Sequence, residues 1–141
     1  MSLRTAIPAA LLLAVTTPAL AGPIDEARAH FDAIAAGNVE KIMQQYTDDA
    51  VFQWVGGPLD GAYTGTDGIR TVWTKFTRAN APLDVKVSKL IEAANPKGAT
   101  VTANVVFKGK QTIKVRYVLV YRGGKLVDEV WQIAPHLGGS Y

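Results

Sequence analysis

The first half of the chain carries apolar residues at helical spacing in three segments. The stripe of the first segment consists of Ile24, Ala27, Phe31, Ile34 and Ala35. The other two stripes recur at i, i+3, i+4 and i+7, and they are Val39, Ile42, Met43 and Tyr46, then Ile69, Val72, Trp73 and Phe76. One apolar stripe per segment is typical of a helix that packs one face on a core. The pattern therefore predicts three amphipathic helices.

Polar and small residues mark the limits of the first two helices. Gly37 is expected to end the first helix, because glycine adopts a left-handed C-terminal conformation without steric cost. Asn38 is a good N-cap for the second helix, which we expect to end near Gln45-Tyr46. Thr47-Asp48-Asp49 is then predicted as a turn, and Ala50-Val51-Phe52 as the start of a strand.

From Leu83 onward the pattern changes from a helical period to an alternation of apolar and polar residues. The candidate strands are Val51–Val55 in the first half, then Leu83–Ala93, Thr100–Phe107, Thr112–Tyr121 and Lys125–Ala134. Short segments rich in glycine separate the later strands, as in antiparallel hairpins. Helices followed by consecutive antiparallel strands predict an α+β domain with its helices on one face of the sheet.

The order of these elements resembles a known superfamily. A helix, a short helix, Asp48-Asp49-Ala50 and a strand resemble the opening of the nuclear transport factor 2-like superfamily, and within it the SnoaL-like domains. The segment Gly65–Arg70 also resembles the glycine-led start of the third helix in that superfamily. The resemblance extends from Ile24 to Pro135. It implies a cone-shaped fold, with three N-terminal helices packed on a curved, mainly antiparallel sheet.

The N-terminal segment has the features of a secretory signal peptide. Arg4 supplies a positive charge, an apolar run follows from Ala6 to Val15, and Ala19-Leu20-Ala21 is a small-x-small cleavage site. The run is shorter than the ~20 residues that span a bilayer. We therefore expect residues 1–21 to be removed and residues 22–141 to form one domain in the periplasm or outside the cell. An uncleaved anchor or a buried helix is the alternative.

Composition limits the kinds of site that the domain can hold. The chain has no cysteine and only two histidines, His30 and His136, so we expect no metal site of the Cys/His type and no cofactor. The segment Gly22–Val85 carries five basic and nine acidic residues, whereas Lys86–Tyr141 carries nine basic and three acidic ones. This asymmetry fits either an anionic ligand or lysines on the solvent side of strands. No basic cluster with interleaved aromatics indicates nucleic-acid binding.

The last hairpin decides which side chains share a face of the sheet. A two-residue turn at Gly123-Gly124 would place Val118 opposite Glu129 and Arg116 opposite Trp131. One face would then carry Lys114, Arg116, Val118 and Val120 with Val127, Glu129, Trp131 and Ile133. The opposite face would carry Ile113, Val115, Tyr117, Leu119 and Tyr121 with Leu126, Asp128, Val130 and Gln132. A bulged turn would exchange this pairing, and alternation alone does not reveal which face meets the helices.

The resemblance implies a pocket between the concave face of the sheet and the helices. The positions that match pocket-lining positions in relatives, together with the predicted hairpin pairing, are His30, Trp54, Arg116, Glu129 and Trp131. His30 and Glu129 are the candidate acid/base residues, because burial and a neighbouring charge can bring either pKa near neutrality. Trp54, Arg116 and Trp131 are the candidate ligand contacts.

Each of these residues also has a purely structural interpretation. His30 fits a histidine at a helix edge with one satisfied hydrogen bond. Arg116 and Glu129 fit an ion pair that seals the sheet, and the two tryptophans fit core positions.

The resemblance also argues against one reaction. A ketosteroid isomerase of the superfamily uses a first-helix tyrosine, a first-strand aspartate and a protonated aspartate on the penultimate strand. The matching positions hold His30, Trp54 and Val118, so we do not expect that route. Scytalone dehydratase-like and SnoaL cyclase-like relatives use His or Asp as acid/base, a part that His30 or Glu129 could take.

Three functions therefore remain open from the sequence. The first is binding of a small, mostly apolar molecule in an internal pocket, with an anionic group near Arg116. The second is cofactor-free acid/base catalysis of the isomerase, dehydratase or cyclase type. The third is a protein-interaction module without catalysis. We also predict a homodimer formed through the apolar face that carries Tyr117 and Leu119.

Overall fold

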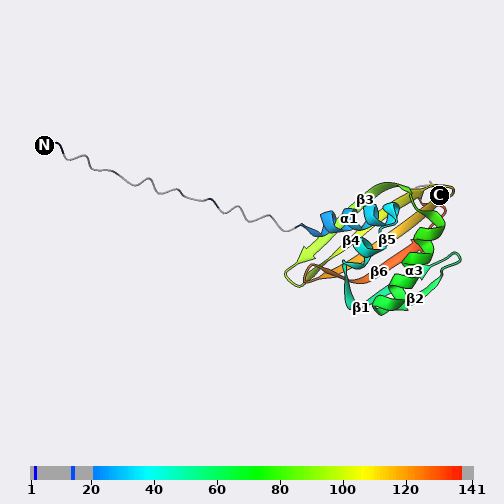
Figure 1. The fold of residues 1–141 in the computed structure, drawn as a ribbon, viewed down its shortest axis with the longest axis horizontal. Coiled ribbons are helices and arrows are strands. Elements are labelled where there is room, and N and C mark those ends of the chain that lie inside the picture. Colours follow the sequence, from blue (N-terminus) through cyan, green and yellow to red (C-terminus); the bar gives the residue numbers. More distant parts are fainter. Residues whose placement is uncertain (1, 3–13, 15–20, 138–141) are drawn as a thin grey trace.

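The computed structural model describes residues 2, 14 and 21–137, so most of the predicted signal peptide lies outside the described residues. The helices are α1 (Pro23–Ala36), α2 (Val39–Met43) and α3 (Gly65–Asn80). The strands are β1 (Tyr46–Val55), β2 (Gly61–Thr64), β3 (Asp84–Asn95), β4 (Gly98–Lys108), β5 (Thr112–Arg122) and β6 (Lys125–Ile133). The predicted α+β class is confirmed, and Figure 1 shows the arrangement.

The boundary between α1 and α2 follows the predicted chemistry. Gly37 has a φ of 73° and its N–H group donates to the carbonyl of Ile34. The side-chain oxygen of Asn38 accepts a hydrogen bond of 3.1 Å from the N–H of Lys41. Both predicted caps are therefore present.

The end of α2 differs from the prediction. The helix stops at Met43, and Tyr46 is the first residue of β1 rather than the last of a helix. The predicted turn Thr47-Asp48-Asp49 lies inside β1. The reason is a contact distant in sequence: Tyr46 pairs with Leu126 of β6, and the N–H of Leu126 donates to the carbonyl of Gln45. The local pattern carries no information about that partner.

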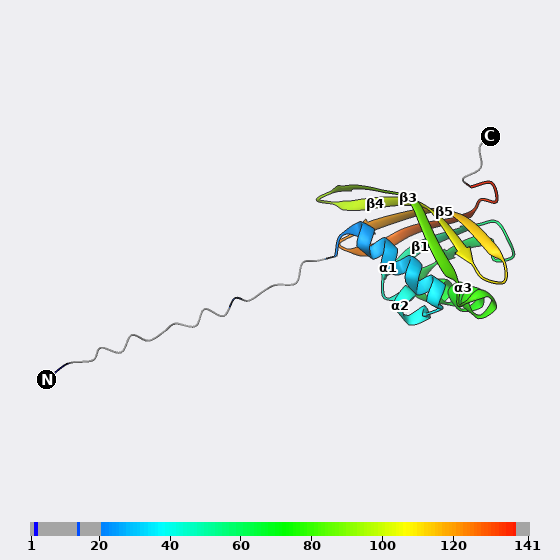
Figure 2. The ribbon, with the colours of Figure 1, turned by 90° about the horizontal axis from the view of Figure 1, so that it is seen from above.

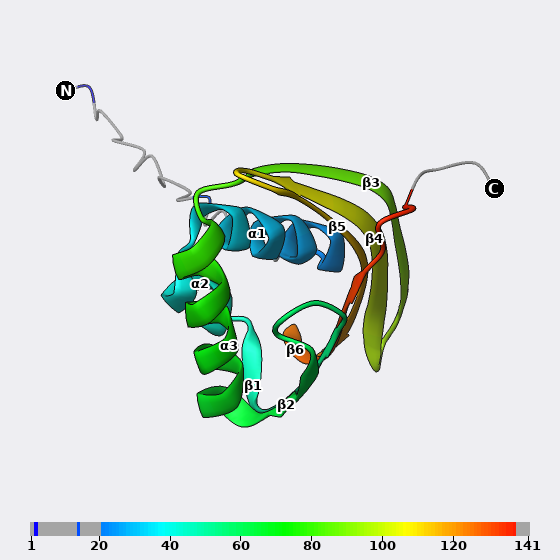
Figure 3. The same cartoon turned by 90° about the vertical axis from the view of Figure 1, so that its right-hand side faces the viewer.

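The strands form one six-stranded sheet in the order β2-β1-β6-β5-β4-β3. All neighbouring pairs are antiparallel except β1 and β6, which run parallel. The sheet is strongly curved and the helices close its concave side (Figure 3). In the view from above, the three helices lie on one side of the sheet (Figure 2).

A β-bulge in β6 changes the predicted register of the last hairpin. Arg122 lies opposite Lys125 across the Gly123-Gly124 turn, as predicted, but Val127 has no partner on β5. The pairs on either side of the bulge are Tyr121 with Leu126 and Val120 with Asp128. Such an extra residue shifts the pairing of every later residue of β6 by one position along β5. Glu129 therefore lies opposite Leu119, and the predicted pairing with Val118 is wrong.

The bulge also reassigns the two faces of the sheet. Tyr117 lies opposite Trp131, and both side chains are fully buried on the helix side, as is Leu119. The face that carries Tyr117 and Leu119 is thus the concave face, and the prediction that it forms a dimer interface is wrong. Arg116 lies on the opposite, convex face, and the prediction that it faces the helices is wrong as well.

The core fills the space between the concave face and the helices. Its largest fully buried side chains come from all layers and include Phe31 of α1, Phe52 of β1, Trp73 of α3, Phe107 of β4 and Trp131 of β6. Within the described residues, no helix has the length and apolar character needed to span a membrane.

Candidate functional site

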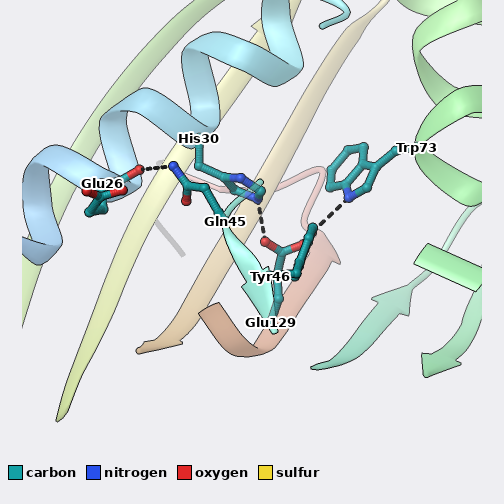
Figure 4. A network of polar contacts seen from close by, with 6 residues as sticks. All are labelled: Glu26, His30, Gln45, Tyr46, Trp73 and Glu129. Carbon is teal, nitrogen blue, oxygen red and sulfur yellow. Dashed lines mark hydrogen bonds and ion pairs between the residues drawn. The ribbon is translucent and has the colours of Figure 1, made fainter. Parts of the chain in front are cut away.

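The interior contains a buried pair of ionisable side chains, His30 of α1 and Glu129 of β6 (Figure 4). His30 Nε2 and Glu129 Oε2 lie 2.6 Å apart, and neither side chain has exposed surface. The hydroxyl of Tyr46 donates to Glu129 Oε1 at 2.7 Å. The indole N–H of Trp73 donates in turn to the Tyr46 hydroxyl at 2.8 Å. Hydrogen bonds thus join α1, β6, β1 and α3 in one network.

Local structure explains why these side chains meet. His30 lies one turn after Ala27 and one turn before Ile34, on the face of α1 that is buried. Glu129 faces inward only because the bulge at Val127 precedes it. Burying an ionised carboxylate is costly unless it is paired and hydrogen-bonded, and here both carboxylate oxygens have a partner.

Tyrosines surround this carboxylate. Burial, and after it the negative charge of Glu129, raises the pKa of Tyr46, of Tyr117 and of Tyr121 above the usual value. The three hydroxyls therefore stay protonated and can act as donors. Within the described residues, the hydroxyls of Tyr117 and Tyr121 and the Nδ1 atom of His30 are buried without a hydrogen-bond partner.

Next to the network lies an aromatic cluster, which we define as Trp54, Trp73, Phe76 and Trp131. Trp54 and Trp131 stack with their ring centroids 4.5 Å apart. The centroid of Trp73 lies 5.5 Å from that of Trp54 and 5.6 Å from that of Trp131. Phe76 lies 5.1 Å from Trp131. All four side chains are at least nine-tenths buried, so the cluster is a closely packed layer.

A cavity of about 530 Å³ opens on the other side of this cluster, and we call it the Trp54 cavity. Its apolar lining consists of Trp54, Pro58, Leu59, Phe76, Ala79, Ile113, Ile133 and Pro135. Its polar lining consists of Lys75, Asn80, Gln111, Thr112 and Lys114. The volume lies within the range of roughly 300–1,000 Å³ that is usual for small-molecule sites.

The cavity and the buried pair lie at different levels along β6. Ile133 lines the cavity, Trp131 belongs to the aromatic cluster, and Glu129 contacts His30. Since a strand rises about 3.3 Å per residue, Glu129 lies about 13 Å from Ile133 along the strand. The aromatic cluster therefore separates the buried pair from the Trp54 cavity.

The structure brings together four of the five residues that the sequence singled out. His30 contacts Glu129, and Trp54 stacks on Trp131. Of the five, only Trp54 lines the cavity. Arg116 is on the convex face, where its Nη1 atom donates to Asn104 Oδ1 at 3.1 Å. The alternative in which Arg116 forms an ion pair with Glu129 does not hold, because His30 is the partner of Glu129.

Sequence reasoning missed Tyr46 and Trp73 as members of the network. Both occupy helical-stripe positions, a pattern that by itself predicts ordinary core residues. The usable signal was chemical, because a buried tyrosine or tryptophan usually needs a partner for its polar atom. Among the described residues, no group of three or more His, Cys, Asp or Glu side chains could hold a metal ion.

Chemically, the network can exchange a proton between His30 and Glu129, with Tyr46 as a further donor to the carboxylate. Neither member of the pair reaches solvent. A second kind of chemistry is available at the Trp54 cavity, where apolar walls and polar rim residues can hold a small molecule.

Comparison with known proteins supports the architecture. The family model of the SnoaL-like domain matches residues 27–128. No curated protein matches this chain.

Several solved structures share the fold. A protein of unknown function with a cystatin-like fold from Nostoc punctiforme has a TM-score of 0.67 and 16% identity, over 79% of this chain and 88% of that one. A nuclear transport factor 2-like protein of unknown function from Pseudomonas putida has a TM-score of 0.66 and 18% identity, over 76% and 80% of the two chains. A hypothetical protein from Catenulispora acidiphila, with a ketosteroid isomerase-like fold and in complex with trimethylamine, has a TM-score of 0.60 and 16% identity, over 78% and 85%. At these identities the likeness concerns the fold.

Proposed function

The chain belongs to the SnoaL-like domain family, and on that premise we propose that it binds a small, mostly apolar molecule in the Trp54 cavity. The observation that carries the proposal is a cavity of about 530 Å³ whose walls are mainly apolar. Exposed rim residues such as Pro58, Lys75 and Gln111 make it reachable from solvent. The structure from Catenulispora acidiphila, which holds trimethylamine, supports small-molecule binding as a use of this fold.

The second candidate is an acid/base enzyme that uses His30 or Glu129. Their separation of 2.6 Å favours it, because a hydrogen-bonded pair can exchange a proton. A catalytic group must, however, come within hydrogen-bond reach of its substrate. Both side chains are fully buried, and the aromatic cluster lies between them and the cavity. The geometry therefore favours binding without catalysis by this pair.

The third candidate, a protein-interaction module whose pocket is filled by side chains, fits the geometry least. Such a module needs no internal space, whereas the Trp54 cavity measures about 530 Å³.

Binding can be tested with a neutral probe, 4-cyclohexylbutanamide. We expect a saturable change in tryptophan fluorescence, since Trp54 lines the cavity and stacks on Trp131. Ala79→Phe places a ring in the cavity and should abolish binding measured by calorimetry. Ala62→Phe, at an exposed position of β2 outside the lining, should leave it unchanged. Equal binding by both variants would contradict the proposal, as would the absence of saturable binding to the wild type by both this amide and the corresponding carboxylate.

The enzyme alternative has its own test. A ketone of similar size, 4-cyclohexyl-2-butanone, can be incubated with the protein in D2O and followed by NMR. We expect no exchange of the protons beside the carbonyl above background. Exchange that Glu129→Gln abolishes would instead favour acid/base catalysis.

We also propose export through cleavage after Ala21. The positive residue, the apolar run and Ala19-Leu20-Ala21 support this. Helix α1 begins at Pro23, so cleavage there would leave the helix intact. The intact mass of protein from the periplasm or the medium should correspond to a chain that starts at Gly22. A full-length chain held in the membrane would contradict export.

A further inference from the structure

The charged residues that line the Trp54 cavity are all positive. Two lysines, Lys75 and Lys114, line it together with eleven uncharged residues and no Asp or Glu. The ion pairs found among the described residues are His30 with Glu129 and Arg70 with Glu40, so neither lysine has an acidic partner there.

The two lysines belong to different walls of the cavity. Lys75 comes from α3, next to Phe76, and Lys114 comes from β5, next to Ile113. Each lysine thus lines the cavity together with an apolar neighbour in the chain. A ligand whose apolar part packs against Phe76 and Ile113 would place its opposite end close to a positive charge.

The surroundings add to the positive charge. Close to the lining, Lys110 precedes Gln111 in the chain, and Lys108 lies opposite Thr112 on one side and Asp84 on the other. Asp60, in the loop beside the lining residue Leu59, uses its Oδ2 atom to accept a hydrogen bond of 2.7 Å from the N–H of Gly56. A low-dielectric cleft edged by one sign of charge concentrates ligands of the opposite sign.

Two neutral polar residues of the rim, Asn80 and Gln111, are hydrogen-bonded to each other. The Nε2 atom of Gln111 donates to Asn80 Oδ1 at 3.0 Å, and the Nδ2 atom of Asn80 donates to the carbonyl of Phe76. These bonds hold the end of α3 against the turn between β4 and β5. They leave the lysines as the strongest free donors of the lining.

We infer that the ligand of the Trp54 cavity is an amphipathic organic anion, with its apolar part against the aromatic and aliphatic walls and its anionic group at Lys75 and Lys114. This inference rests on the proposed function and names the ligand class for the same site. It also moves the anionic contact from Arg116, which is outside the lining and donates to Asn104, to two basic residues of the lining.

The experiment compares two probes of nearly the same shape, 4-cyclohexylbutanoate and 4-cyclohexylbutanamide, by calorimetry at pH 7 and low salt. We expect the carboxylate to bind at least about tenfold more tightly, because hydrogen bonds to charged groups are stronger than neutral ones. Lys75→Gln and Lys114→Gln should each weaken binding of the carboxylate and leave that of the amide unchanged. Lys97→Gln, outside the lining, is the matched control.

Each outcome has a distinct meaning. If both probes bind equally well, the inference on ligand class is overturned and the proposed function stands. If neither binds, the proposed function fails and the inference fails with it. If the double variant of Lys75 and Lys114 keeps the preference for the carboxylate, the assignment of these lysines is overturned.

Discussion

Glu129 is the only acidic residue among the described positions that is fully buried. Its carboxylate receives a hydrogen bond from Tyr46 and contacts His30, and these partners come from β1 and α1. Burial of such a pair is tolerated only while both members are present. Removal of one member leaves the other polar group buried without a hydrogen-bond partner. At the scale of single residues, the network therefore acts mainly as a connection between the helices and the sheet.

Glu129→Ala should strongly destabilise the fold. The change leaves His30 and the Tyr46 hydroxyl without their acceptor, and we expect a loss of about 3–5 kcal/mol in the free energy of unfolding. Denaturant unfolding followed by circular dichroism measures it. Glu129→Gln, which keeps an acceptor oxygen, should cost less, and Glu92→Ala at an exposed position should cost little. A wild-type-like midpoint for Glu129→Ala would contradict the buried network.

The tyrosines around Glu129 predict behaviour in alkali. Burial and then the charge of Glu129 raise the pKa of Tyr46 and of Tyr117, so the native state keeps these protons above pH ~10, where unfolded tyrosine ionises. The unfolded chain loses them first, and the stability should therefore fall as the pH rises above about 10.

Absorbance of tyrosinate during an alkaline titration tests this. We expect these tyrosines to ionise only as the protein unfolds, and Tyr46→Phe to remove one of the late-titrating groups. Reversible ionisation of every tyrosine with native circular dichroism would be inconsistent with the buried network.

At the scale of elements, the decisive feature is the bulge at Val127. It lets Glu129 and Trp131 share the concave face with Tyr117. If Val127 instead paired with Val120 in an unbroken ladder, Glu129 would lie opposite Val118, on the convex side. The bulge therefore sets the register in which the buried network forms.

Deletion of Val127 should leave the fold intact. The deletion would join the pairs Tyr121–Leu126 and Val120–Asp128 into a regular ladder, so Glu129 and Trp131 would stay on the concave face. Circular dichroism and size-exclusion chromatography should show a folded, soluble chain. Val127→Ala keeps the residue count and should cost about 1 kcal/mol or less. An unfolded or aggregated deletion variant would contradict this register.

The limits of sequence reasoning are clearest in these elements. The helical stripes, the Gly37 and Asn38 caps and the Gly123-Gly124 turn were predictable, because each depends on residues close in sequence. The start of β1 at Tyr46 and the bulge at Val127 were not, because both depend on strand pairing across the fold. The residues of the candidate site divide in the same way, into those that local sequence predicts and those that depend on strand pairing. His30, Trp54 and Trp131 came from position and residue type, whereas Arg116 was misplaced by the register.

At the scale of the whole molecule, the convex face is the sheet surface that the helices do not cover (Figure 3). One row across it joins Ile91, Thr102, Val118 and Val130 in register. The side chain of Ile91 is 62% exposed, and the other three are half-buried. The predicted homodimer stays a prediction, and this convex row is the apolar sheet surface that could form it.

A charge in that row should then disrupt a dimer. Light scattering coupled to size exclusion should give a dimer for the wild type and a monomer for Val118→Asp, because an unpaired carboxylate in an apolar interface is costly. Ala36→Asp, at an exposed position on α1, is the control for added charge. A wild type that stays monomeric at high concentration would contradict the dimer.

The position of β6 has a consequence for how the chain acquires its structure. Strand β6 follows the other five described strands in the chain, yet it lies between β5 and β1, near the middle of the sheet. Until residues 125–133 are available, β1 has only the four-residue β2 as a neighbour. Pairing of segments this far apart in sequence is slow compared with local folding. A growing chain therefore cannot complete the sheet before its C-terminal segment is made, which keeps it open for the export that we propose.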